Sequence, residues 1–342
     1  MTKVLLTGGA GFVATHIISQ LLERGHKVVA TVRSKEEEQV VRDAHKDSGK
    51  DNIEFVIVPD MVVKGAFDEA AQIEGLGAVL HIASPFFYDF VDAQKELVDP
   101  AVHGTTWLFE AIHRYAPTVK RIVMTPSFAS VLDEDRLEDP STVFTEKDWN
   151  PVTMDEVNNS KATAYRVSKK FAERAAWDFV AENRTSFDLV TVCPSLVLGP
   201  IKHRLPSLDK VNTSNSRMVD LVQGKWKEVI PDAYLAAVYW IDVRDLALTH
   251  ILGMEKPEAG GRRLMPLGGR FGNRMIADIV WKHFPELREK LPGPDVPGGS
   301  LAPAEQVYRV DNTETKRFLG IEWREFETTI VDCVDSLKPY GI

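Results

Sequence analysis

Short apolar runs alternate with amphipathic stretches over the first 195 residues. Six runs predict β-strands: 3–8, 27–32, 53–60, 78–84, 121–127 and 187–195. Three stretches between them predict helices: 11–25, 35–48 and 162–184. The first of these carries apolar residues at 12, 13, 17, 18, 21 and 22, which is the spacing of one helix face.

The predicted strands are apolar throughout and do not alternate with polar residues. Such strands, separated by helices, favour a parallel sheet that is covered by helices on both faces. The pattern therefore predicts an α/β protein with a Rossmann-type, doubly wound parallel sheet of the dinucleotide-binding kind.

The pattern loosens after residue 195, where proline and glycine become frequent. The run 239–252, "YWIDVRDLALTHIL", is typical of a return to the main domain. We therefore expect a division that is discontinuous in sequence. Residues 1–195 plus about 236–254 would form the cofactor-binding domain, and about 196–235 plus 255–342 a smaller substrate-binding region.

A glycine-rich turn, "TGGAGFVA", joins the first predicted strand to the first helix. Gly8, Gly11 and Ala14 fit G-x-x-G-x-x-A, and Gly9 can replace Gly8 in the related G-x-G-x-x-A pattern. Small residues here permit a tight turn and let the backbone approach a pyrophosphate at the positive end of the helix. We expect Phe12 and Val13, inside the same turn, to join this cofactor-binding surface.

The second strand ends in "TVRSK". A cofactor with a free ribose 2′-hydroxyl is usually held at this point by Asp or Glu, whereas a guanidinium can hold a 2′-phosphate bidentately. Arg33 therefore favours NADPH over NADH. Lys35 is either a second contact to the phosphate or an ordinary solvated helix start.

The ends of the later strands supply further candidates. Asp60 either accepts a hydrogen bond from the adenine amino group or caps a turn, and Met61 follows it. After the fourth strand, we expect Ala83, Ser84 and Pro85 to lie against the cofactor. We expect Phe86, the next residue, to face the substrate. After the sixth strand, the backbone at Pro194 and Val197 is expected near the nicotinamide.

Tyr165 and Lys169 are spaced one helical turn apart, so their side chains share a helix face. A nearby ammonium favours the ionised phenol and lowers its pKa, so that Tyr165 can pass a proton to a carbonyl oxygen. Ser127, at the end of the fifth strand, can hydrogen-bond the same oxygen. Lys170 and Glu173, by contrast, are expected on a solvated face of this helix.

Composition narrows the choice of partners. The chain has 342 residues with 41 Lys and Arg against 50 Asp and Glu, a net charge of −9 with no basic stripe, which disfavours nucleic acid. No apolar run approaches the ~20 residues of a membrane span. Two separated cysteines and scattered histidines predict no disulfide and no metal site, with Cys193 a buried thiol. We expect a cytoplasmic protein, monomer or homodimer.

The assembled motifs resemble the extended short-chain dehydrogenase/reductase family, and within it the fungal NADPH-dependent methylglyoxal/isovaleraldehyde reductases. The resemblance covers essentially the whole chain and rests on "TGGAGFVATHI", "TVRSKEE", "VIVPDM", "HIASPF", "TPSFASV", "AYRVSKKFAERAAWDF", "CPSLVLGP" and "YWIDVRDLALTH". It implies a catalytic set of Ser127, Tyr165 and Lys169. It also implies a substrate pocket lined by Phe86, Phe128 and Leu198.

Three positions depart from the pattern of that family. Pro126 stands within Thr125-Pro126-Ser127 where Thr-Ser-Ser is usual, and Phe128 stands where an aromatic with a hydroxyl is often found. His103 replaces an asparagine at a position expected to give structural support. Altered substrate scope is plausible from these changes, and loss of activity is not implied.

The sequence therefore predicts NADPH-dependent reduction of aldehydes and ketones to chiral alcohols, acting on small-molecule carbonyl compounds. A sugar-nucleotide epimerase or dehydratase is the first alternative, against which the apolar residues after Pro85 and Ser195 argue. A dihydroflavonol or cinnamoyl-CoA type of reductase stays open. A non-catalytic NADP-sensing regulator would predict loss of Tyr165 or Lys169, and both are present.

Overall fold

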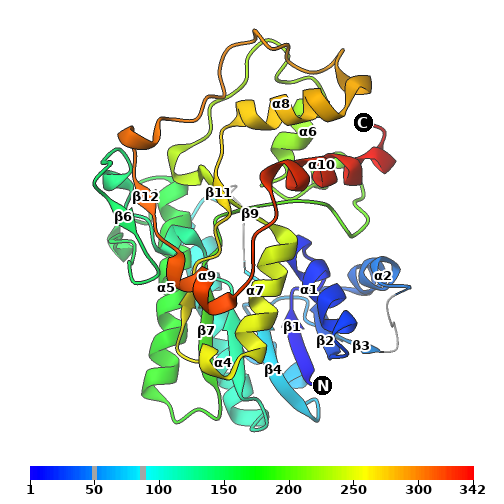
Figure 1. Ribbon diagram of the computed structural model, residues 1–342. Helices are drawn as coiled ribbons and strands as arrows, with labels where there is room; N and C mark the ends of the chain where they lie inside the picture. Colours follow the sequence, from blue (N-terminus) through cyan, green and yellow to red (C-terminus); the bar gives the residue numbers. More distant parts are fainter. Residues whose placement is uncertain (48–51, 85–89) are drawn as a thin grey trace.

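The computed structural model describes residues 1–47, 52–84 and 90–342, and its main feature is a seven-stranded parallel sheet (Figure 1). The strand order is β10-β7-β5-β4-β1-β2-β3. The strands are β1 (Lys3–Thr7), β2 (Lys27–Val32), β3 (Ile53–Ile57), β4 (Leu76–His81), β5 (Arg121–Met124), β7 (Asp188–Val192) and β10 (Arg263–Leu264). This confirms the predicted doubly wound α/β architecture.

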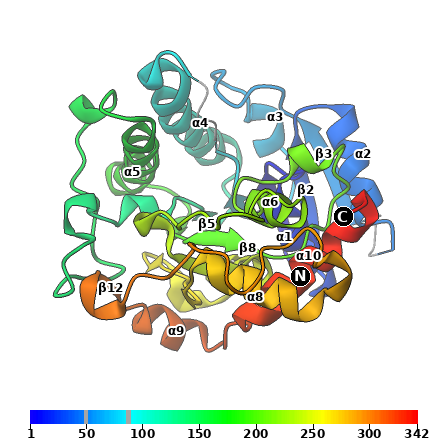
Figure 2. The same ribbon diagram turned by 90° about the horizontal axis from the view of Figure 1, so that it is seen from above.

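Helices cover both faces of this sheet (Figure 2). One face carries α1 (Phe12–Glu23), α2 (Lys35–Ala44) and α7 (Val243–Glu255), and the other α3 (Asp68–Ala71), α4 (Asp99–Tyr115) and α5 (Lys161–Glu182). Successive residues of β1 explain the apolar pattern: Val4 and Leu6 pack toward α1, whereas Leu5 packs toward α4. Each inner strand must therefore be apolar on both faces.

The smaller region has its own core and its own three-stranded sheet. Strand β9 (Tyr239–Asp242) lies between β8 (Leu196–Leu198) and β11 (Gly269–Arg270). Helices α6 (Ser216–Val222), α8 (Asn273–His283) and α10 (Phe326–Leu337) share a buried cluster with Trp240. Two short strands, β6 (Val143–Phe144) and β12 (Arg309–Val310), pair in parallel, and α9 (Thr313–Leu319) follows them.

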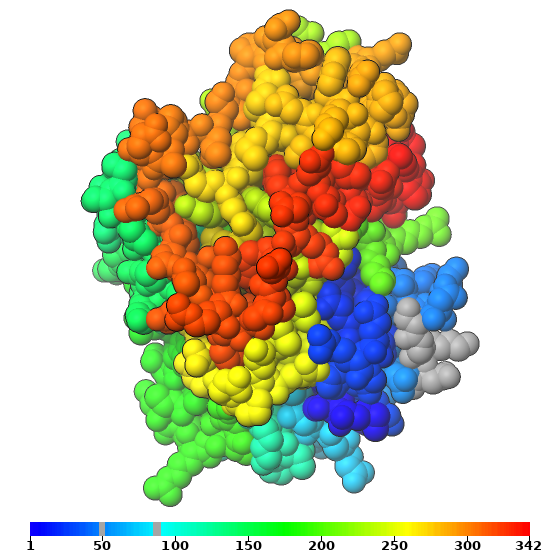
Figure 3. Space-filling view, in the orientation of Figure 1, coloured from blue at the N-terminus to red at the C-terminus, as the bar shows by residue number. Residues whose placement is uncertain are grey.

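Figure 3 shows the late part of the chain, in orange and red, at the top of the molecule and continuing downward beside the yellow residues to the level of the blue N-terminal ones. None of the helices in the described ranges is both long enough and apolar enough to cross a bilayer.

Four of the predicted strands end three residues too late. The predicted 53–60, 78–84, 121–127 and 187–195 end in the structure at Ile57, His81, Met124 and Val192. The extra residues are the first ones of the loops at the carboxyl edge of the sheet, where all of them except the buried Cys193 line a cavity. Helix α4 was not predicted, and the helix expected over 35–48 ends at Ala44.

Two details correct the expected division of the chain. Arg263–Leu264 was placed in the smaller region, but it pairs with β7 and forms the edge of the main sheet. Strand β9 was placed in the main domain, but it belongs to the three-stranded sheet, and only α7 returns to the main layer. Two-residue strands carry too little pattern to be recognised in a sequence.

Candidate active site

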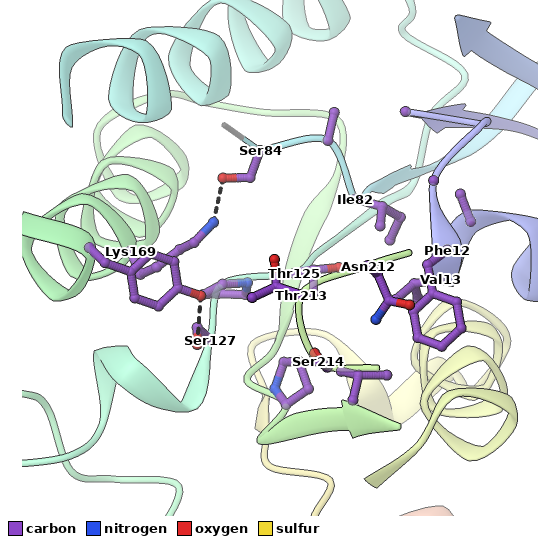
Figure 4. Close-up of a pocket in the computed structure, with 18 of the residues that line it drawn as sticks. Phe12, Val13, Ile82, Ser84, Thr125, Ser127, Lys169, Asn212, Thr213 and Ser214 are labelled. Atoms are coloured by element: carbon purple, nitrogen blue, oxygen red, sulfur yellow. Dashed lines mark hydrogen bonds between the residues drawn. The ribbon is translucent and has the colours of Figure 1, made fainter. Parts of the chain in front are cut away.

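A cavity of about 1030 Å³ lies at the carboxyl edge of the main sheet (Figure 4). Its walls come from the loops after β1, β2, β3, β4, β5 and β7, from the first turns of α1 and α5, and from two segments of the smaller region, 212–214 and 234–237. Ligands of open α/β sheets bind at this edge, because all the parallel strands end there.

The glycine turn forms one end of the cavity. Gly8 has a φ of +70°, a left-handed conformation that glycine adopts without strain, and its N–H donates to Thr31 Oγ1 at 3.1 Å. A Cβ on Gly9 would lie 2.8 Å from the Cβ of Ala30, so the turn packs directly on β2. Both positions therefore require glycine.

Helix α1 presents its positive end to this cavity. Its N-cap, Gly11, has no side chain to accept a hydrogen bond, and the first turn contains no acidic residue. Phe12, Val13 and Ala14 line the cavity beside it. Backbone N–H groups at such a terminus, with the helix dipole behind them, fit a pyrophosphate.

At the end of β2, the structure separates the two predicted phosphate contacts. Arg33 lines the cavity, but its guanidinium lies 2.5 Å from Oε1 of Glu37, which lines the cavity as well. Lys35 lies outside the lining, at the first residue of α2, where it pairs with Glu38 at 2.8 Å. Of the two alternatives that the sequence left open for Lys35, the structure therefore agrees with a solvated residue at the start of a helix.

The predicted residues after β3 and β4 line the same cavity where the structure describes them. Asp60 and Met61 do so, and Oδ1 of Asp60 accepts a hydrogen bond from the Val62 N–H at 2.9 Å, the expected turn-capping alternative. Ala83 and Ser84 line it too. Pro85 and Phe86 lie outside the described residues.

The three predicted catalytic residues come together on the cavity wall, where Figure 4 labels Ser127 and Lys169. The Tyr165 hydroxyl donates to Oγ of Ser127 at 3.3 Å, and Nζ of Lys169 donates to Oγ of Ser84 at 2.5 Å. The Lys169 ammonium also lies 5.4 Å from the centroid of the Tyr165 ring. Helix α5 presents both residues because Ser160 caps it, accepting the Thr163 N–H at 2.9 Å, one turn before Tyr165.

Burial sets the electrostatics of this set. Desolvation lowers the pKa of Lys169 to about 8, so its ammonium is still the main form at neutral pH. Behind it, desolvation lowers the pKa of His81 to about 3, with the Lys169 charge a smaller cause. His81 is therefore neutral, and its Nδ1 lies 2.9 Å from the Thr7 hydroxyl.

The wall beyond Ser127 is mostly apolar. Phe128 lines the cavity and its ring meets Tyr239 edge to face, with the centroids 6.2 Å apart. Further apolar lining residues are Ala129, Leu132, Ala162, Ala236 and Ala237. Pro194 and Val197 line the cavity, but Leu198 does not. Leu198 is fully buried in the core of the smaller region, because side chains alternate along β8.

Several lining residues were not predicted from the sequence. Asn212, Thr213 and Ser214 come from a polar run inside the proline-rich segment, and Figure 4 shows Asn212 beside Phe12 and Val13. Arg166 donates to Oε1 of Glu134 and to the Tyr234 hydroxyl, both at 2.7 Å. The polar run "VNTSNS" was the available signal.

Two lining residues also carry unsatisfied polar atoms. Oγ of Ser195 and Oδ1 of Asn212 are buried and have no hydrogen-bond partner within the described part of the chain. Buried polar atoms rarely stay unpaired. Their place on the cavity wall is consistent with partners on a bound ligand.

Glu173 corrects a prediction. The sequence placed it on a solvated face, but it is fully buried and its Oε1 lies 2.7 Å from Nε of Arg263. Its Oε2 accepts the Ser130 hydroxyl at 2.5 Å. Arg263 comes from β10, whose place in the sheet the pattern could not reveal. Lys170 is partly buried and donates to the carbonyl oxygen of Val152 at 2.5 Å.

The departures from the family pattern leave the predicted catalytic set in contact. Thr125 Oγ1 lies 2.7 Å from Nε2 of His250, whose pKa burial lowers to about 4, and Ser127 still reaches Tyr165 across Pro126. His103 is exposed on α4, where it stacks on Trp107 with the centroids 4.9 Å apart. Cys193 is buried as predicted, and burial raises its pKa to about 12.

The described residues contain no group of three or more His, Cys, Asp or Glu placed to hold a metal ion.

Comparison with known proteins gives consistent matches. Residues 4–267 match the NAD dependent epimerase/dehydratase family. Ketoreductase azaE of Aspergillus niger is 39% identical over 98% of this chain and 97% of its own length. The NADPH-dependent methylglyoxal reductase GRE2 of Saccharomyces cerevisiae is 35% identical over 99% and 98%. The crystal structure of Gre2 from Candida albicans in complex with NADPH superposes with a TM-score of 0.90 at 33% identity, covering 100% of both chains.

Proposed function

This chain belongs to the NAD dependent epimerase/dehydratase family, and from that premise we propose that it is an NADPH-dependent carbonyl reductase that converts aldehydes and ketones into chiral alcohols. One observation carries the proposal. The Tyr165 hydroxyl lies 3.3 Å from Oγ of Ser127, with Lys169 one turn further along α5, in the cavity that also contains the glycine turn.

The residues at the glycine end fit the cofactor. Gly8, Gly11, Phe12, Val13 and Ala14 would hold the pyrophosphate on the free N–H groups of α1. The remaining contacts that we propose are Arg33, Asp60, Met61, Ala83, Ser84, Pro194 and Val197, all of which line the cavity. When bound, NADPH supplies a hydride to the carbonyl carbon.

The proton that the carbonyl oxygen needs would come from a side chain of this protein. The Tyr165 hydroxyl would give its proton to the carbonyl oxygen, so that the oxygen becomes the alcohol hydroxyl and the phenol becomes a phenolate. Lys169 stabilises that phenolate by its positive charge, and solvent returns the proton afterwards. Ser127 orients the carbonyl oxygen through its own hydroxyl. Oγ of Ser127 is itself held by the Ala129 N–H at 3.1 Å.

The apolar wall indicates the class of substrate. Phe128, Leu132 and the alanines of segment 234–237 present no charge to the space beyond Ser127. A small carbonyl compound with an apolar substituent can bury that substituent against these residues and so remove it from water. We assign this substrate-covering role to the smaller region, with the main sheet and α7 holding the cofactor.

We propose a monomer or homodimer that acts in the cytoplasm without nucleic-acid partners. Its two cysteines are buried and free, as in a reducing compartment, and its net charge of −9 disfavours polyanions.

The test is a set of carbonyl compounds with NADPH oxidation followed by absorbance. It should include a short aldehyde, an α-dicarbonyl, an aryl ketone, a dihydroflavonol and a cinnamoyl thioester. We expect turnover of the aldehydes and ketones, with the alcohol as product. Turnover confined to the thioester would instead support the cinnamoyl-CoA type of reductase, and no turnover of any carbonyl would contradict the proposal.

A further inference from the structure

Glu37 occupies the wall of the cavity beside Arg33, one helical turn away. Its Oε2 accepts the Arg33 backbone N–H at 2.8 Å, and its Oε1 accepts the guanidinium Nε at 2.7 Å. The carboxylate thus receives donors from both the backbone and the side chain of Arg33. Only 24% of the Glu37 side chain is exposed, against 78% of the Arg33 side chain. Glu37 is therefore the better-anchored partner of the two.

The neighbouring cations are paired with carboxylates as well. Lys35 lies 2.8 Å from Glu38, and Arg42 lies 2.7 Å from the same carboxylate. The first turn of α2 contains Glu36, Glu37 and Glu38, which already compensate the positive end of that helix. This terminus therefore offers a phosphate neither an unpaired cation nor a free helix dipole.

The charges that line this end of the cavity sum to a negative value. The lining residues that follow β2 and β3 include one cation, Arg33, and two carboxylates, Glu37 and Asp60. The other lining cations, Arg166 and Lys169, are on α5, beside the catalytic set. A 2′-phosphate brings further negative charge to a place where the net charge is already unfavourable.

The two nicotinamide cofactors differ at this point alone. A carboxylate after the second strand is the group that accepts a hydrogen bond from a free ribose 2′-hydroxyl, whereas a guanidinium holds a 2′-phosphate. This chain places both groups here and ties them to each other. To hold a 2′-phosphate, Arg33 must exchange a carboxylate partner for a phosphate one, while Glu37 stays close and repels the phosphate.

We propose that Glu37 is a specificity-determining residue that makes this enzyme accept NADH beside NADPH. The Glu37 carboxylate accepts the 2′-hydroxyl of NADH, and the exposed Arg33 side chain turns to meet the 2′-phosphate of NADPH. The inference rests on the proposed dinucleotide site and deepens it. We therefore expect the enzyme to prefer NADPH over NADH only slightly. The repulsion between Glu37 and the 2′-phosphate would be the reason that this preference is small.

Binding of the oxidised cofactors, measured by titration calorimetry without substrate, tests this directly. We expect wild-type dissociation constants for NADP⁺ and NAD⁺ within about tenfold of each other, since the favourable charge-assisted contact to Arg33 is offset by Glu37. Glu37→Gln should tighten NADP⁺ by about tenfold and weaken NAD⁺. The probe 2′,5′-ADP should follow NADP⁺, and 5′-ADP should follow NAD⁺.

Glu36→Gln is the matched control, because it removes the same charge from the same turn at an exposed residue outside the cavity lining. It should leave the ratio of the two dissociation constants unchanged. A second variant, Arg33→Gln, should weaken NADP⁺ more strongly in the Glu37→Gln background than in the wild type.

Two results would overturn the inference: a wild-type preference for NADP⁺ above a hundredfold, or equal effects of Glu37→Gln and Glu36→Gln. Failure of both dinucleotides to bind the folded wild-type protein would instead overturn the proposed function, so the two failures are distinguishable.

Discussion

The hydroxyls of Tyr165 and Ser127 lie 3.3 Å apart although 38 positions separate the two residues in the sequence. Tyr165 comes from α5, and Ser127 from the loop after β5. A buried network holds these two elements together, because Oγ of Ser130 lies 2.5 Å from Oε2 of Glu173 and 2.7 Å from the carbonyl oxygen of Ser127. The geometry of the proposed catalytic set thus depends on side chains outside that set.

Tyr165→Phe should abolish most of the reductase activity. The change removes the only proton that the phenol can give to the carbonyl oxygen, and general acid catalysis of this kind contributes about 10²–10⁴-fold. We expect kcat to fall by that amount, while the dissociation constant of the cofactor changes little. NADPH oxidation in the steady state measures the first quantity, and calorimetry the second.

Tyr115→Phe controls for loss of a hydroxyl elsewhere, since Tyr115 lies at the end of α4 outside the cavity lining. It should retain wild-type activity. A Tyr165→Phe enzyme with unchanged kcat would contradict the assigned proton donor.

The activity should fall in alkaline solution because Lys169 loses its charge. Burial lowers the pKa of this ammonium to about 8, so the charged form predominates below that pH and the neutral form above it. The parameter kcat/KM for NADPH reports groups of the free enzyme. We expect it to be flat near pH 7 and to fall about tenfold per pH unit above about 8.

Lys169→Arg tests whether Lys169 is the group that titrates. A guanidinium stays charged across the accessible range, so the variant should be less active but lack the decline near pH 8. If the wild-type profile stayed flat to pH 10, the lowered pKa of Lys169 would be wrong. If Lys169→Arg kept the same decline, another group would be responsible for it.

Glu173→Gln should strongly destabilise the fold. Glu173 is fully buried and Arg263 nearly so, with 2.7 Å between Oε1 and Nε, so the change leaves a buried guanidinium without its counter-charge. Breaking a buried pair from one side costs about 3–5 kcal/mol. Urea unfolding, followed by circular dichroism and by fluorescence, measures the loss.

Glu327→Gln provides the comparison, because it removes one partner of an exposed pair in which Glu327 lies 2.7 Å from Lys282. Exposed pairs contribute little, so the urea midpoint of this variant should stay near that of the wild type. Equal effects of the two substitutions would mean that burial of the Glu173–Arg263 pair is not what matters.

The sequence predicted the parts of the site that follow from strand ends and helix period. Gly8, Gly11, Ser127, Tyr165 and Lys169 each stand at a fixed offset from a strand or on one helix face, so the fold alone brings them together. The six long strands of the main sheet were predictable for the same reason, because burial on both faces leaves continuous apolar runs.

What the sequence could not show depends on distant partners. The sequence around Glu173 is typical of an exposed helix position, because its partner Arg263 comes from a distant two-residue edge strand. Glu37 looks like an ordinary first-turn carboxylate until its contact with Arg33 and its place on the cavity wall are known. Asn212 lies in a segment with no periodic pattern. In each case the tertiary contact, and not the local pattern, gives the residue its environment.

Leu198 and Phe128 were both expected to line the substrate pocket, and the structure separates them. Phe128 lines the cavity, whereas Leu198 packs wholly inside the smaller region with Trp240 and Phe271. Leu198→Ala should therefore lower the free energy of unfolding by about 2–5 kcal/mol, the usual cost of truncating a buried leucine. It should leave the KM of the folded enzyme for carbonyl substrates unchanged.

Phe128→Leu should change the substrate preference and have little effect on stability, the opposite of what we expect for Leu198→Ala. The change keeps most of the apolar volume, so we expect a small loss of stability, but it reshapes the wall beyond Ser127. The ratio of kcat/KM for a bulky aryl ketone to that for a short aldehyde should shift by about tenfold, as expected for a small change of volume in an apolar pocket. If Leu198→Ala shifted this ratio more than Phe128→Leu did, the substrate would contact β8 rather than the wall formed by Phe128.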